Sequence, residues 1–116
     1  MRRTPSELAQ EYADAVIKQE ECIFQGNARK GNQYARRYIQ IANQLLRGGE
    51  EAISVFVELL QHPDPNVRGN AAANLLKVRT AEAVAALEPL AEIEGLTGLG
   101  AKMTLERYRR GELEIK

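Results

Sequence analysis

The chain has 116 residues, 44% hydrophobic and 28% charged, a composition typical of a folded domain rather than a disordered segment. Its 16 basic and 16 acidic residues balance, so net charge predicts no bulk attraction to nucleic acid or an anionic membrane. One cysteine excludes an intramolecular disulfide and fits a reducing compartment. We find no signal peptide and no stretch long enough to span a bilayer, and therefore expect one cytoplasmic domain over residues 1–116.

Three helices are predicted in the first half of the chain. A Thr-Pro-Ser-Glu capping-box pattern begins a helix over residues 5–25. A second helix ends at Arg47, before two glycines, and Gly31 and Asn32 leave its start open. The third, over residues 50–62, is apolar around most of its circumference, as in a helix that packs on two sides. The apolar stripes of the first two helices comprise Leu8, Tyr12, Ala15, Val16, Ile23, Tyr34, Tyr38, Ile41, Ala42 and Leu45.

Three more helices are predicted in the second half. The sequence His-Pro-Asp-Pro-Asn at residues 62–66 predicts a tight turn into a fourth helix. Thr80 is expected to cap a fifth helix. The glycines within residues 95–100 are expected to delay the start of a sixth helix, which ends at Gly111. No useful stretch alternates with period two, so no strand is predicted. The inward-facing residues are expected to be Val67, Ala71, Leu75, Val78, Val84, Leu87, Leu90, Ile93, Met103 and Tyr108.

The second half also contains a weak internal repeat. Residues 51–76 and 82–107 share four identical residues at matching positions, within the same helix-turn-helix layout. Repetition at about thirty residues is typical of helical solenoids. The predicted fold is therefore all-α, a short right-handed solenoid of about three antiparallel helical hairpins.

The segment HPDPNVRGNAAANLL, residues 62–76, resembles the turn and second helix of a HEAT repeat, in the short form of phycocyanobilin-lyase-type repeats. In that family the turn aspartate and the following arginine form a ladder that ties repeats together. The resemblance implies this role for Asp64 and Arg68. The following repeat has Gly95 and Leu99 at these positions, so the resemblance implies no ladder there.

The whole chain is similar to a small bacterial HEAT-like family of unknown function. Three features carry the similarity: a long first hairpin, the motif HPDPNVRGNAA, and the ending GAKMTLERYRRGEL. Some members lie near polymorphic-toxin genes and are regarded as immunity proteins. The resemblance therefore implies a cytoplasmic protein that binds and neutralises a toxin domain.

Residues able to support catalysis or metal binding are scarce. The chain has one histidine, His62, one cysteine, Cys22, and two aspartates, and it lacks phosphate-loop, HExxH and GxSxG motifs. Cys22 is expected to be a half-buried structural residue, and His62 to bond the carbonyls at a helix end. We therefore predict no catalytic residues, no metal site and no cofactor.

Charge divides between alternate helices. The first, third and fifth helices carry twelve acids and one lysine, a net of −11, whereas the second, fourth and sixth carry twelve bases and two acids, a net of +10. In a solenoid the second helices of hairpins line one face, so this pattern predicts a basic face; alternatively, opposite charges merely bridge neighbouring helices. Amides beside the bases are typical of a polar recognition surface. The predicted partner-binding residues are Arg29, Arg36, Arg37, Gln40, Asn70, Asn74, Lys77 and Lys102.

These observations favour a non-catalytic protein-binding module, monomeric on its own, and the resemblance implies that its partner is a toxin domain. One alternative is a HEAT-like protein that binds the nucleic-acid backbone with its basic face. The small number of aromatic residues and the large acidic surfaces argue against this alternative. A general scaffold or adaptor protein is the other.

Overall fold

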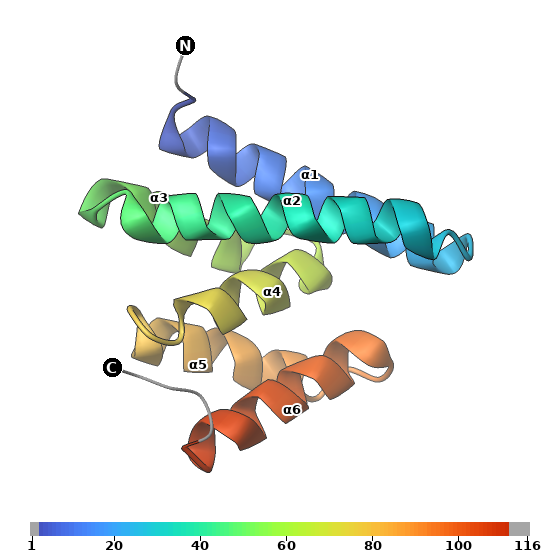
Figure 1. Cartoon of the computed structure of the whole chain (residues 1–116). Coiled ribbons are helices and arrows are strands. Elements are labelled where there is room, and N and C mark those ends of the chain that lie inside the picture. Colours follow the sequence, from blue (N-terminus) through green and yellow to red (C-terminus); the bar gives the residue numbers. More distant parts are fainter. Residues whose placement is uncertain (1–2, 112–116) are drawn as a thin grey trace. The chain divides into compact units, whose positions relative to one another are not determined.

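The computed structural model describes residues 3–111, and all regular structure in that range is helical. Its helices form two compact units, Met1–Leu59 and Leu60–Lys116, which we describe separately. The last two residues of the ending motif, 112–113, lie outside the described range. The elements are α1 (Pro5–Phe24), α2 (Ala28–Arg47), α3 (Glu50–Glu58), the 3₁₀ turn η1 (Leu59–Gln61), α4 (Pro65–Leu75), α5 (Thr80–Leu90) and α6 (Leu96–Arg109) (Figure 1).

In the first unit α1 and α2 lie side by side along their length, and α3 packs against both (Figure 1). Three aromatic rings join the three helices. Tyr12 of α1 is fully buried, and its ring centroid lies 5.6 Å from that of Tyr38 on α2 and 5.1 Å from that of Phe56 on α3. Both pairs meet edge to face, the arrangement that aromatic quadrupoles favour.

Both long helices begin with a side-chain cap. The predicted capping box is confirmed, because Glu7 N–H donates to Thr4 Oγ1 and Thr4 N–H donates to the Glu7 carboxylate. Asn27 caps α2, so the helix starts at Ala28 and is not delayed at Gly31. A Cβ at Gly31 would lie 3.4 Å from Cys22 Cβ, so this glycine allows α1 and α2 to approach closely.

In the second unit α4, α5 and α6 contact one another. Asp64 caps α4 by accepting hydrogen bonds from the backbone N–H groups of Asn66 (2.7 Å) and Val67 (3.3 Å), and Pro65 occupies the first turn. The core comprises the expected Val67, Ala71, Leu75, Leu87 and Leu90, together with Ala72, Leu76, Ala83, Ala101 and Leu105.

Several predicted element ends are wrong. The helix expected to run to His62 narrows to a 3₁₀ turn after Glu58. Arg79, not Thr80, occupies the cap position of α5, because the Thr80 hydroxyl donates to the Leu76 carbonyl (2.7 Å). The sixth helix starts at Leu96, earlier than expected, because Gly95 takes a φ of 98° that turns the chain directly into it.

Four residues predicted to face inward are exposed. Val78 lies beyond the end of α4 and is 43% exposed, and Ile93 lies beyond the end of α5. Ile23 and Met103 are 54% and 52% exposed on their helices. Apolar periodicity alone did not show which apolar residues a neighbouring helix covers.

Candidate functional site

The exposed face of α2 is a continuous polar stripe. Its residues recur every three or four positions, which places them on one side of the helix, and the opposite side buries Ile41, Ala42 and Leu45. α2 contains five basic residues and no acid. We call the following set the α2 stripe: Arg29, Gln33, Arg36, Gln40, Gln44 and Arg47, all exposed.

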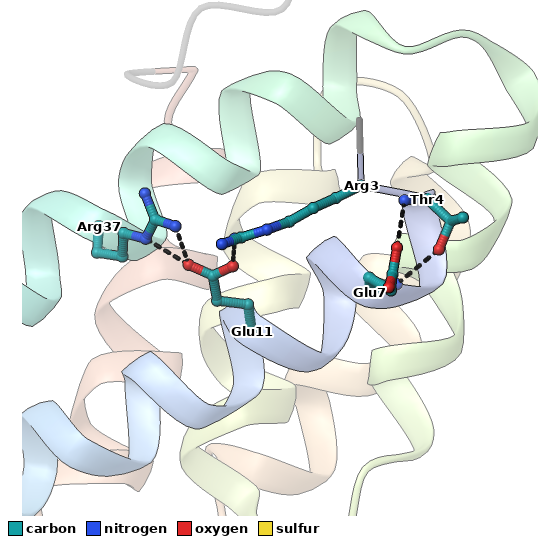
Figure 2. Close-up of polar contacts among 5 residues, drawn as sticks. All are labelled: Arg3, Thr4, Glu7, Glu11 and Arg37. Carbon is teal, nitrogen blue, oxygen red and sulfur yellow. Dashed lines mark hydrogen bonds and ion pairs between the residues drawn. The ribbon is translucent and has the colours of Figure 1, made fainter. Parts of the chain in front are cut away.

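Arg37 lies on the flank of the stripe, facing α1. Its guanidinium group contacts the carboxylate of Glu11, and Arg3 contacts the other oxygen of that carboxylate (Figure 2). The Glu11 side chain is only 26% exposed. Arg37 is exposed like Arg36, but unlike Arg36 it also joins α2 to α1 across the hairpin. Within residues 3–111, no hydrogen bond or ion pair engages the Arg36 side chain.

A hollow of about 520 Å³ adjoins this cluster. Two guanidinium groups, two amides and two aliphatic side chains line it: Arg3, Arg37, Gln40, Gln44, Leu8 and Ile41. A surface of this chemistry suits a protruding polar or acidic side chain with an apolar stem. Sequence reasoning missed Arg3, Leu8 and Ile41 as lining residues, since only the fold brings residues 3–8 beside α2.

The predicted residues of the second unit divide into two kinds. Lys77 and Lys102 are exposed. Asn70 and Asn74 are half-buried and bond back along their own helix: Asn70 Nδ2 donates to the Asn66 carbonyl (2.8 Å), and Asn74 Nδ2 to the Asn70 carbonyl (2.9 Å). These bonds give the asparagine spacing a local structural reason.

The turn before α4 is held by its own side chains. Arg68 Nη1 donates to the carbonyls of His62 (2.8 Å) and Pro63 (3.1 Å), while Asp64 caps the helix. His62 Nδ1 accepts a hydrogen bond from Asp64 N–H (3.0 Å), so the expectation that its imidazole bonds helix-end carbonyls is wrong. The bonds of Asp64 and Arg68 stay within this turn, whereas the resemblance implied a ladder between repeats.

Opposite charges do bridge neighbouring helices within each unit, in the described part of the chain. Besides Arg37 and Glu11, Arg109 of α6 pairs with Glu88 of α5 at 3.0 Å. Both Arg109 and Glu88 are more than half exposed, so their pair contributes little stability. Bridging therefore accounts for part of the charge segregation, but no ion pair among residues 3–111 engages the arginines of the α2 stripe.

Chemical groups for other functions do not gather in the described part of the chain. No three His, Cys, Asp or Glu residues among residues 3–111 lie where they could hold a metal ion. Cys22, expected to be half-buried, is instead buried in the core, against Gly31. Burial raises the pKa of the Tyr38 hydroxyl. None of the described helices is both long and apolar enough to cross a membrane.

Comparisons with known proteins agree with this geometry. A family model for HEAT repeats matches residues 26–95, more than half of the chain. No curated protein matches the chain. Among solved structures, the crystal structure of the protein RPA1889 from Rhodopseudomonas palustris CGA009 is similar, with a TM-score of 0.90 and 21% sequence identity over 99% of this chain and 96% of that one. The likeness shows a shared fold.

The predicted all-α, HEAT-like fold is thereby confirmed. HEAT repeats generally mediate protein interactions, and their helical fold is typically not catalytic. The chain belongs to the HEAT repeat family.

Proposed function

We propose that this chain is a non-catalytic protein-binding module that contacts its partner through the α2 stripe. The observation that carries the proposal is the stripe itself, in which Arg29, Arg36 and Arg47 alternate with amides and no acid intervenes. Arginine is enriched at protein interfaces, where its planar fork binds carboxylates in pairs of hydrogen bonds. The complementary partner surface is acidic and rich in hydrogen-bond acceptors.

The hollow beside the stripe supports this proposal. Gln40 and Gln44 belong to both the stripe and the hollow, so a partner lying along α2 could place one side chain in it. Glu11 holds the guanidinium group of Arg37 at its edge, which reduces the entropy lost on binding. Lys77 and Lys102, with the half-buried Asn70 and Asn74, are proposed as further contact residues in the second unit.

We further propose that the partner is a toxin domain and that the chain is its cytoplasmic immunity protein. This finer proposal rests on the resemblance of residues 62–76, and of the chain as a whole, to the HEAT-like family described above. An immunity protein acts by covering its target, which requires a broad contact surface and no catalytic group. The α2 stripe is such a surface.

Binding to the nucleic-acid backbone is the alternative that the basic charge of α2 favours. Such binding weakens steeply with salt, because each neutralised phosphate releases counterions. We expect no duplex binding at about 1 μM protein and physiological salt in a gel-shift assay. Tight, sequence-independent binding would favour the alternative over a protein partner. A general scaffold or adaptor role is the remaining alternative, and it predicts binding without neutralisation.

The test is co-expression of this chain with any toxin-domain protein whose gene is found to adjoin its own, scored by growth. The stripe variant carries Arg29→Glu, Arg36→Glu and Arg47→Glu, and we expect it to lose protection while remaining folded, since exposed substitutions each cost less than about 0.5 kcal/mol. The matched control reverses three exposed acids of the same unit: Glu21→Arg, Glu51→Arg and Glu58→Arg. Protection by the stripe variant together with failure of the control would show that the acidic helices bind the toxin. No protection by the unmodified chain would contradict the immunity role.

A further inference from the structure

The outer side of α6 is apolar where water should favour polar residues. Leu96 is 80% exposed, and Leu99 and Met103 are each 52% exposed. Their spacing of three and four residues places them on one side of the helix. We call Leu96, Leu99 and Met103 the α6 stripe.

The α6 stripe is not the side by which α6 joins its own unit. That side carries Gly98, Ala101 and Leu105, all buried. A helix side that meets water normally carries polar side chains. Single exposed apolar residues are ordinary, but three along one side of a helix mark a contact surface.

The charges at the two ends of the stripe identify what fits it. Glu92 and Glu94, both exposed, precede α6, whereas residues 102–110, at the other end of the helix, carry four bases and one acid. The helix is therefore acidic before its first turn, apolar through its first half and basic toward its end. A second α6 laid antiparallel on the first would place each acidic end beside a basic end.

We propose that the α6 stripe is the contact surface for a second copy of this chain, with the two α6 helices packed antiparallel about a two-fold axis. Such a contact is self-complementary, because each copy supplies both the acidic and the basic end. Leu99 of one copy then lies near Met103 of the other, and Glu94 lies near Arg107 of the other. The dimer departs from the monomer expected from the sequence, and it does not depend on the function proposed for α2.

Sedimentation equilibrium of the purified chain tests the proposal. We expect reversible dimerisation with a dissociation constant in the roughly micromolar range, since the stripe is short. Leu99→Glu should raise that constant at least about tenfold, because it places like charges at the centre of the contact. The control is Ile39→Glu on α2, where Ile39 is 54% exposed; this substitution should leave dimerisation unchanged. Circular dichroism of both variants establishes that they fold.

A charge exchange tests the antiparallel arrangement. Glu94→Lys and Arg107→Glu should each weaken self-association, and mixing the two variants should restore it, since both contacts in the mixed dimer are then between opposite charges. Failure of the mixture to recover would overturn the arrangement. A chain that stays monomeric at about 1 mM, or a Leu99→Glu variant that dimerises normally, would overturn the proposal. So would a monomer whose stripe instead binds lipid vesicles.

Discussion

Phe56 and Phe24 are the two phenylalanines of the chain, and the structure places them at opposite extremes of burial. Phe56 is fully buried on α3 and contacts Tyr12 edge to face, whereas Phe24 is 84% exposed at the end of α1. The same substitution, phenylalanine to alanine, therefore tests the core of the first unit against an internal control.

We expect Phe56→Ala to lower the free energy of unfolding by about 3–5 kcal/mol, because it loses the transfer energy of the ring and leaves a cavity. The edge contact with Tyr12 adds about 0.5–1.5 kcal/mol to what burial alone provides, which favours the upper half of that range. Phe24→Ala should change the same free energy by less than about 0.5 kcal/mol.

Urea denaturation followed by far-ultraviolet circular dichroism measures both changes. With a slope of about 2 kcal/mol per molar urea, Phe56→Ala should lower the midpoint by about 2 M, and Phe24→Ala should hardly move it. Equal losses at the two positions would refute the assignment of the core. So would a loss below about 1 kcal/mol at Phe56, since no fully buried phenylalanine is expected to be so dispensable.

Three further predictions concern the helix ends. Gly98→Ala should destabilise the chain by about 1–3 kcal/mol, because a Cβ at this position would overlap the Ile93 carbonyl. Gly100 has open space around it, so Gly100→Ala should stabilise the chain by up to about 1 kcal/mol. Thermal unfolding of the two variants measures both changes. Asp64→Ala should cost about 0.5–2 kcal/mol and Asp64→Asn much less, since asparagine also caps; equal losses in urea titrations would count against the cap. Hydrogen bonds from the backbone N–H of Thr4, and then from its hydroxyl, hold the pKa of Glu7 below its ordinary value of 4.5. The stability that the Glu7 carboxylate contributes is therefore complete above about pH 4.5, and it is lost as the pH falls through the lower pKa of the folded state. Glu7→Gln should remove this part of the acid dependence, as measured by unfolding at a series of pH values.

Local sequence signals predicted the elements they control directly. The capping box at Thr4 and Glu7, the proline and aspartate before α4, and the glycines after Arg47 each act within a few residues, so their pattern is visible in the sequence. The predicted start of α6 was too late, because a glycine in a sequence can mark either the interruption of a helix or the residue just before one begins. Only the φ of 98° at Gly95 shows that this one precedes a helix.

The candidate site was predicted only in part. Exposure of Arg29 and Arg36 follows from helical spacing, and it is observed. The engagement of Arg37 by Glu11 could not be predicted, because it depends on how α1 and α2 align over a separation of 26 residues. Similarly, Asn70 and Asn74 carry the polar signature of a surface, but their amides serve their own helix.

The central claim is that the α2 stripe binds an acidic protein surface. Its most direct test is the association rate constant of the purified complex, measured by stopped flow at low and at physiological salt. We expect the rate constant to fall with rising salt, and Arg29→Glu with Arg36→Glu to lower it by about tenfold or more at low salt, because charges across an interface steer encounter. A rate constant that responds neither to salt nor to these substitutions would contradict the claim.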